Sequence, residues 1–271
     1  MKTILITGAS SGIGQATALH FLGQGWNVIA TMRNPDAAGE MRDHPNALVV
    51  ALDVTDHASI ATAVAAGEAR FGTIDVLLNN AGYGAYGPLE SFSMERIERV
   101  FDTNVIGLMA MMKAVIPAMR ERRSGTIINI SSVGGQLAFP TGALYHGTKF
   151  AVEGLSEALY YELDAVGVRM RIIQPGFVKT NFGGAGFDRA DTEALPDYAE
   201  PTAGTGRMFG ALATSLAEPA EVAQVIWQAA NDPSNQLRYR AGNDAAITML
   251  DTRREQDDET FLAGIRKLMD G

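Results

Sequence analysis

The feature that most constrains the fold is a regular alternation of short apolar runs with segments that carry apolar residues at helical spacing. "TILIT" (3–7) is rich in β-branched residues, closes on "GASSGIG", and is followed by the helical pattern "QATALHFLGQG". Six more runs predict strands: "WNVIAT" (26–31), "ALVVALDV" (47–54), "IDVLLNN" (74–80), "GTIINIS" (125–131), "VRMRIIQP" (168–175) and "LRYRAG" (237–242). Helices are predicted after Pro35 and at about 56–71, 93–122, 143–165 and 220–231, and the C-terminal tail is amphipathic. Strands apolar on both faces between amphipathic helices indicate an α/β fold with a covered parallel sheet.

The length favours one domain over residues 1–271, with two domains as the alternative. The alternation of predicted strands and helices is interrupted at about 181–219, a stretch with many glycines and prolines and several aromatic side chains. We expect this stretch to be a mobile insertion that covers the substrate.

Composition excludes some classes of function. A formal net charge of -9 and scattered basic residues argue against a nucleic-acid partner, and the absence of cysteine excludes disulfides and thiol chemistry. No stretch has about 18 uninterrupted apolar residues, and the N-terminus reaches glycine before a signal-peptide core could form. We therefore expect no membrane partner and a cytoplasmic location.

The segment "TGASSGIG" predicts a phosphate-binding turn. Gly8, Gly12 and Gly14 lie between a strand and the start of a helix, where free amide groups and the helix dipole favour a pyrophosphate. Their spacing is G-x-x-x-G-x-G, which serves the same tight turn and close backbone approach as G-x-G-x-x-G. The alternative is that the glycines only make a turn.

The end of the second strand, "ATMRN", suggests which dinucleotide binds. It lacks the carboxylate that would meet the ribose 2′-hydroxyl of NAD, while Arg33 and Ser11 could hold a 2′-phosphate. NADP(H) is therefore preferred and NAD(H) remains possible, since Arg33 could instead stack on the adenine and Asp36 follows closely. Asp53 is expected to meet the adenine amino group or, alternatively, to cap the following turn.

The stretch "YHGTK" puts Tyr145 and Lys149 one helical turn apart, so that both can face the crevice at the carboxyl edge of the sheet. Lowering a phenol pKa from about 10 to about 7 needs roughly 4 kcal/mol. An ammonium about 4 Å away, at an effective dielectric near 20, contributes about that much. The pair is thus predicted to act as a proton donor and acceptor near neutral pH.

Two more polar residues point to the same edge. Ser132 ends the fifth strand 13 residues before Tyr145, and its hydroxyl could hold a substrate carbonyl. Asn104, inside a long helix, could anchor a water leading to Lys149, although a helix kink or a satisfied core amide is the commoner role. Ser131 is expected to be structural.

These motifs together resemble the short-chain dehydrogenase/reductase superfamily in its single-domain branch. "TGASSGIG", "NNAG" (79–82), Asn104, "ISS" with Ser132, "YHGTK" and "PGFVKT" (175–180) occur in the family's order and spacing. The resemblance implies a Rossmann-type, doubly wound sheet of seven strands and a catalytic set of Asn104, Ser132, Tyr145 and Lys149. It also implies that Lys149 binds the nicotinamide ribose, that "NNAG" packs beside the cofactor, and that Thr180 contacts the carboxamide.

The expected cofactor-binding residues are Gly8, Ser10, Ser11, Gly12, Ile13, Gly14, Arg33, Asp53, Val54, Asn80, Ala81, Gly82, Tyr145, Lys149, Pro175, Gly176, Val178 and Thr180. The predicted function is NADP(H)-dependent interconversion of a ketone or aldehyde and its alcohol, and the resemblance implies transfer of the pro-S hydride. "ATMRN" and "RYRAGNDA" are more weakly similar to members that act on steroids and retinoids. A redox sensor without turnover and a sugar-nucleotide epimerase or dehydratase are the alternatives.

The substrate is expected to be apolar and small. Residues that could line its pocket, or only pack, are Tyr83, Tyr86, Leu137, Phe139, Phe182 and Phe187. His146 is expected to face solvent or a neighbouring helix, and the other histidines lack metal-ligand spacing, so no metal is predicted. The apolar helices at 107–119 and 150–166 suggest a homodimer or homotetramer, although core packing explains them almost as well.

Overall fold

The computed structural model spans the chain, and the residues described are 1–180, 187–192, 195–213 and 215–271. Among them, seven strands form one parallel sheet: β1 (Thr3–Thr7), β2 (Asn27–Met32), β3 (Ala47–Ala51), β4 (Val76–Asn79), β6 (Gly125–Ile130), β7 (Val168–Pro175) and β9 (Arg238–Ala241). The α-helices are α1 (Gly12–Gly23), α2 (His57–Phe71), α3 (Met94–Phe101), α4 (Gly107–Glu121), α5 (Ala143–Asp164), α6 (Ala199–Leu212), α7 (Pro219–Asn231), α8 (Asp244–Glu255) and α9 (Asp258–Asp270). All seven predicted strands are confirmed. The short helix predicted after Pro35 is a 3-10 helix, Pro35–Asp43.

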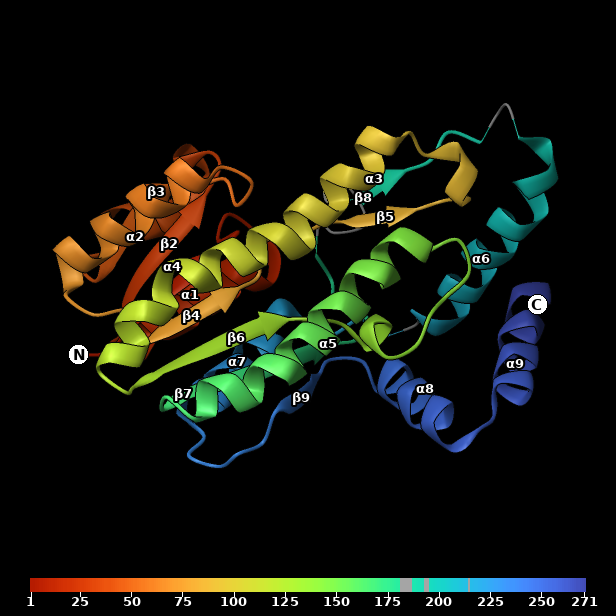
Figure 1. Cartoon of the computed structure of the whole chain (residues 1–271). Helices are drawn as coiled ribbons and strands as arrows, with labels where there is room; N and C mark the ends of the chain where they lie inside the picture. Colours follow the sequence, from red (N-terminus) through yellow and green to blue (C-terminus); the bar gives the residue numbers. More distant parts are fainter. Residues whose placement is uncertain (181–186, 193–194, 214) are drawn as a thin grey trace.

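The sheet has a separate apolar core on each face. Along β1, Ile4 and Ile6 pack on one side with α1 and α7, whereas Leu5 packs on the other side with α2, α4 and α5. In Figure 1, α1 and α7 lie behind the sheet while α4 and α5 cross in front of it. Because alternate residues of a strand face opposite sides, a strand with apolar residues at successive positions, such as Ile4, Leu5 and Ile6, requires helices on both faces. The predicted doubly wound fold is confirmed.

The strand order β3-β2-β1-β4-β6-β7-β9 runs outward from β1 in one direction to β3 and, from β4 on, in the other direction to β9, so the strand order reverses between β1 and β4. β1 pairs with both β2 and β4, and Ile6 lies beside Leu78. In an open parallel sheet, ligands bind outside the carboxyl ends of the strands at such a reversal. The segments that leave β1, β4 and β6 therefore reach one edge together.

The helix predicted over 93–122 is continuous but not uniform. A π-helical turn, Asp102–Ile106, joins α3 to α4. The combined helix Met94–Glu121 is long and apolar enough to span a membrane, and 44% of its most apolar window is buried. Its apolar face packs into the core through residues such as Met111, Met112 and Met119, which a core helix of a soluble protein also does.

The interruption at 181–219 contains more regular structure than the sequence predicted. β8 (Phe187–Arg189) pairs in parallel with β5 (Gly84–Tyr86), and α6 packs against α9. These elements lie beyond the carboxyl ends of the main strands in Figure 1. The glycines within α6 concealed it, and one of them, Gly204, lies where an added Cβ would approach the Cβ of Met269 at 3.1 Å. Phe182 lies outside the described residues.

Candidate active site

The glycine loop is built so that the backbone of β1, α1 and the segment after β4 can come very close together. Gly8 and Gly12 have φ values of 69° and 56°, which favour glycine. A Cβ at Gly14 would lie 2.3 Å from the Gly8 carbonyl oxygen and 2.6 Å from Asn80 Nδ2. The Asn80 amide in turn donates to the carbonyls of Thr7 (2.9 Å) and Gly8 (3.1 Å). The loop is thereby fixed at the N-terminus of α1, which favours an anion.

The residues expected to bind the cofactor gather around one cavity of about 1190 Å³. Those that line it are Gly8, Ser10, Ser11, Gly12, Ile13, Arg33, Asp53, Val54, Asn80, Ala81, Gly82, Tyr145, Lys149, Pro175, Gly176, Val178 and Thr180. Gly14 lies behind the loop instead of lining the cavity. This arrangement fits a dinucleotide, because the cavity extends from a glycine loop at a helix N-terminus to a basic side chain beyond β2.

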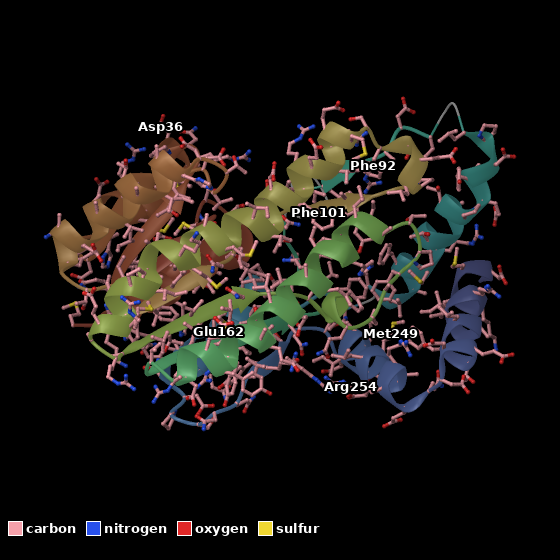
Figure 2. All side chains as sticks on the ribbon, in the orientation of Figure 1. Asp36, Phe92, Phe101, Glu162, Met249 and Arg254 are labelled. Carbon is pink, nitrogen blue, oxygen red and sulfur yellow. The ribbon has the colours of Figure 1, made fainter. Side chains whose placement is uncertain are left out.

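Arg33 and Asp53 line the far end of this cavity, whereas Asp36 does not line it. Arg33 is exposed and lines the cavity. Asp36 lies at the outer edge of the molecule in Figure 2, 85% exposed, and pairs with Arg42 at 2.9 Å. Asp53 Oδ1 accepts bonds from the amide (2.9 Å) and hydroxyl (2.7 Å) of Thr55, so this carboxylate caps its turn. The backbone bond from Thr55 lowers the pKa of Asp53.

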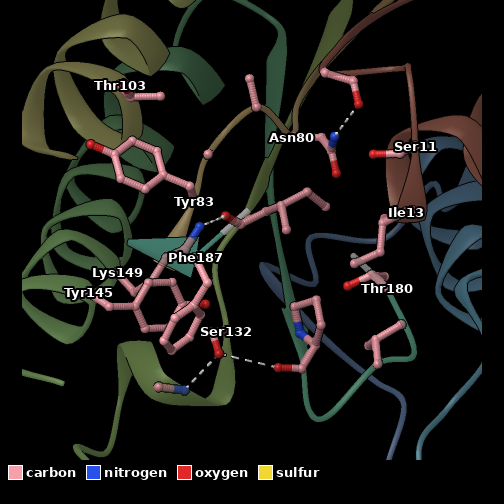
Figure 3. Close-up of a pocket in the computed structure, with 18 of the residues that line it drawn as sticks. Ser11, Ile13, Asn80, Tyr83, Thr103, Ser132, Tyr145, Lys149, Thr180 and Phe187 are labelled. Atoms are coloured by element: carbon pink, nitrogen blue, oxygen red, sulfur yellow. Dashed lines mark hydrogen bonds between the residues drawn. The ribbon is translucent and has the colours of Figure 1, made fainter. Parts of the chain in front are cut away.

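Ser132, Tyr145 and Lys149 meet at the other end of the cavity, where Figure 3 shows them beside Phe187. Lys149 Nζ donates to the carbonyl of Ile130, at the end of β6, over 2.8 Å. It lies 5.8 Å from the centre of the Tyr145 ring. The Ser132 hydroxyl accepts the Gly134 amide at 3.0 Å and lies 3.4 Å from the Pro175 carbonyl. The end of β6, the end of β7 and α5 thus fix the three side chains.

The expected acidity of the Tyr145 phenol was wrong for the protein chain alone. Burial raises the pKa of Tyr145 to about 12, against the opposing effect of its hydrogen bond with Ser132. Burial also lowers the pKa of Lys149 to about 8, against the opposing charge of Glu153. The attraction of a nearby cation lowers the pKa of a phenol, but here the desolvation of the buried phenol outweighs it.

Asn104 lies in the π-helical turn and holds the segment after β4. Its Oδ1 accepts the Tyr83 amide at 3.0 Å, and its Nδ2 donates to the Tyr83 carbonyl (2.9 Å) and to Thr148 Oγ1 (3.1 Å). π-Helical turns are frequent at functional sites because they redirect one side chain. A water between Asn104 and Lys149 stays a prediction.

Aromatic side chains form the wall of the cavity beyond Tyr145. The residues that line it there are Tyr83, Tyr86, Phe139, Phe177, Phe187 and Phe209. The Tyr86 ring stacks on Phe187 with centres 5.0 Å apart and lies 5.7 Å from the Tyr145 ring. Leu137 instead belongs to the core formed with α6, α8 and α9. Phe209 is one of the side chains of the 181–219 stretch that were expected to cover something apolar. Phe177 was not predicted, because no local pattern tells a pocket aromatic from a core one.

His146 does not face solvent; it faces the short 3-10 helix Val133–Gly135, the second of the two placements that were expected. It is 3% exposed and packs against the turn that follows Ser132. Its Nδ1 lies 2.8 Å from the Gly134 carbonyl, which assigns a hydrogen to that nitrogen. Its Nε2 accepts the Phe139 amide at 3.0 Å and lies 3.3 Å from Tyr86 Oη. Burial lowers the pKa of His146, which keeps the ring neutral and able to accept both bonds.

Comparison with known proteins agrees with this arrangement. Residues 2–190 match the family model described as short chain dehydrogenase. An uncharacterized oxidoreductase of Schizosaccharomyces pombe is 44% identical over 241 residues, covering 88% of this chain and 99% of its own. The 17-beta-hydroxysteroid dehydrogenase type 1 of Mus musculus is 35% identical over 258 residues, covering 89% and 73%.

Solved structures give the same result. A short-chain dehydrogenase from Streptomyces avermitilis is 36% identical with a TM-score of 0.84, covering 94% of each chain. A serine dehydrogenase complexed with NADP+ is 32% identical (TM-score 0.73; 88% and 94% covered). A short-chain dehydrogenase/reductase from Burkholderia phymatum in complex with NAD is 26% identical (TM-score 0.78; 93% and 92% covered). The chain belongs to the short-chain dehydrogenase/reductase family and is an oxidoreductase that acts on CH–OH groups.

Proposed function

We propose that this enzyme interconverts an apolar ketone or aldehyde and the corresponding alcohol, with NADP(H) as the preferred cofactor and Tyr145 as the general acid and base. The observation that carries this proposal is the meeting of Ser132, Tyr145 and Lys149 between the glycine loop and the aromatic wall. The nicotinamide dinucleotides held by two of the solved relatives support a cofactor of this type.

The residues present fit the cofactor along the whole cavity. The first turn of α1, after Gly8 and Gly12, would hold the pyrophosphate, and Arg33 with Ser11 would hold a 2′-phosphate. When bound, the nicotinamide is the hydride donor or acceptor of the reaction. NADP(H) is favoured because Asp36, the nearest carboxylate past β2, is turned outward to Arg42.

In carbonyl reduction, Tyr145 donates its phenolic proton to the substrate oxygen. A pKa of about 12 keeps that phenol protonated near neutral pH, as an acid must be. The Ser132 hydroxyl, which already accepts the Gly134 amide, can donate its own hydrogen to the same oxygen. Lys149, whose pKa of about 8 lies close to neutral, then returns a proton to the phenolate. The aromatic wall excludes water and suits an apolar substrate.

The acid assignment is tested with Tyr145→Phe. A positioned general acid contributes about 10²–10⁴-fold, so the substitution should reduce kcat by at least about 100-fold while the dissociation constant for NADPH stays nearly unchanged. NADPH consumption over a panel of apolar ketones and aldehydes measures the first and fluorescence titration the second. Turnover that persists in the variant would refute the assignment.

Cofactor choice is tested with Arg33→Asp. A carboxylate in place of the guanidinium repels a 2′-phosphate and can accept a bond from a ribose hydroxyl, so kcat/KM should shift from NADPH towards NADH. Arg266→Asp is the control for a change of charge alone, because Arg266 is exposed and does not line the cavity. An unchanged ratio of kcat/KM values in Arg33→Asp would show that Arg33 does not recognise the phosphate.

We also propose that the enzyme is a homodimer or homotetramer. Ile106 lies in the π-helical turn before α4 and is 46% exposed, while Phe150 and Tyr161 lie on α5 and are 47% and 70% exposed. Exposed large apolar side chains of this kind are candidates for a contact between subunits. Light scattering of the wild type and of Phe150→Glu measures the assembly, and a monomeric wild type would disprove it.

A further inference from the structure

Glu153 is a buried carboxylate one helical turn beyond Lys149 on α5, and the proposed reaction gives it no role. Its side chain is 6% exposed. Its Oε2 accepts a bond from Arg238 Nε at 2.8 Å, and its Oε1 accepts one from Gln174 Nε2 at 3.0 Å. Those partners lie on β9 and β7, so this carboxylate joins three elements beneath the reacting groups.

The turn that follows Ser132 also rests on Glu153. A Cβ at Gly135 would lie 2.5 Å from Ser131 Oγ, 2.8 Å from Glu153 Cγ and 3.0 Å from the carbonyl of Lys149. Gln136 Nε2 lies 3.5 Å from Glu153 Oε2. The close contact at Gly135 therefore sets the position of the turn that carries the Ser132 hydroxyl relative to the helix that carries Lys149.

The charges around Glu153 do not balance without Lys149. Arg238 pairs with Glu153 and also with Glu157, which is 54% exposed. One guanidinium thus serves two carboxylates and leaves one negative charge beside α5. A buried carboxylate is stable only when its charge is compensated, and Lys149 is the cation one turn away on the same face. The charge of Glu153 raises the pKa of Lys149 against the effect of burial.

We propose that Glu153 is a positioning residue, which keeps Lys149 in its ammonium form near neutral pH and holds the Ser132 turn against α5. This role rests on the proposed function of Lys149 as the proton source for Tyr145. Glu153 is then the group that keeps the ammonium of Lys149 charged in a buried site.

The ionisable groups around Lys149 are few among the residues described. On its own helix they are Tyr145, Glu153 and, one turn further, Glu157. β9 contributes Arg238, while β6 and β7 contribute the Ile130 carbonyl and the neutral Gln174 side chain at this point. His146 faces the turn after Ser132. Glu153 is therefore the charge whose removal should affect Lys149 most.

The size of the effect follows from the geometry of the helix. One carboxylate about 6 Å from an ammonium, at an effective dielectric near 20, raises the ammonium pKa by roughly two units. Arg238 offsets part of this, so Glu153→Gln should lower the Lys149 midpoint by about one unit. Glu157→Gln is the matched control, because it removes a carboxylate from the same arginine at a more exposed position, and should shift the midpoint by less than about 0.3 unit.

The direct test is a pH titration of Lys149 by NMR in protein labelled with ¹³C-lysine. The chain has five lysines, and Lys149→Arg identifies the signal. A lower midpoint in Glu153→Gln, with little change in Glu157→Gln, is the expected result. Arg238→Gln should move the midpoint upward, because it leaves Glu153 without its counter-ion, and this opposite shift tests the role even if Glu153→Gln folds poorly.

Activity gives a second readout that a merely structural role would not reproduce. In Glu153→Gln the alkaline limb of NADPH-dependent reduction should move to lower pH by the shift that NMR measures, while kcat near pH 6.5 stays within about threefold. An unchanged Lys149 midpoint, or loss of kcat at every pH with that midpoint unchanged, would overturn the proposal. If the wild type reduces no carbonyl compound, the proposed function fails, and the titration still decides the role of Glu153.

Discussion

Gly14→Ala would place a methyl group where the cofactor loop closes on itself. The new Cβ would lie 2.3 Å from the carbonyl oxygen of Gly8 and 2.6 Å from Asn80 Nδ2. The first of these atoms belongs to the backbone, so it cannot move away by a rotamer change. The loop between β1 and α1 must shift, and with it the free amides at the start of the helix.

Two opposing effects set the magnitude. Alanine is favoured over glycine within a helix by about 0.8–1.0 kcal/mol. Overpacking a close-packed site costs about 1–3 kcal/mol, and a backbone contact that is short by about 1 Å belongs at the upper end. The cost of the clash therefore exceeds the gain in helix propensity by roughly 1–2 kcal/mol. If this cost falls on the bound form of the loop, NADPH binds about 5- to 30-fold more weakly.

Gly23→Ala is the matched control in the same helix. An added Cβ there meets no described atom within 4 Å, so only the gain in helix propensity applies. Fluorescence titration of NADPH and thermal unfolding should show weaker binding or a lower Tm for Gly14→Ala, with unchanged binding and an equal or higher Tm for Gly23→Ala. Normal affinity together with a normal Tm in Gly14→Ala would refute the assignment of Gly14 to the closure of the loop.

Two further predictions concern protons at the site. Because the pKa of Lys149 is lowered to about 8, its ammonium is present below that pH and lost above it. Initial rates measured from pH 6 to 10 should therefore show carbonyl reduction falling through about pH 8 and alcohol oxidation rising. If the two rates changed with pH in the same direction, the prediction would be contradicted. His146→Phe leaves the Phe139 amide and the Tyr86 hydroxyl without their acceptor. It should lower stability by about 1–3 kcal/mol and raise KM for the carbonyl substrate, whereas exposed His57→Phe should change neither in unfolding and kinetic assays.

The sheet was predictable from the sequence because both of its faces are buried. A strand such as β1 or β4 then has an unbroken run of three apolar residues, and this signal does not depend on knowing its neighbours. α6 was missed for the opposite reason. Its glycines lower helix propensity, and Gly204 is explained only by its close packing against Met269 on α9, which is distant in sequence.

The candidate site was predictable where it depends on local spacing. Tyr145 and Lys149 share one helix face, and the glycine loop follows a strand directly, so short motifs fix these relations. His146 and Glu153 depend instead on partners that come from other elements. Arg238 lies 85 residues beyond Glu153, and no spacing rule connects the two.

The corrected pKa values change the chemical interpretation of the Tyr145–Lys149 pair. A phenol that ionised near pH 7 would serve alcohol oxidation and carbonyl reduction about equally. With burial raising the pKa of Tyr145 to about 12, the chain alone holds the phenol in the form that donates a proton. Lys149, with its pKa lowered to about 8, is then the group whose charge changes near neutral pH, and the charge of Glu153 raises that pKa against the effect of burial. In the proposed reaction, the supply of protons therefore depends on the charge of Lys149 and its ion-pair neighbours more than on the phenol.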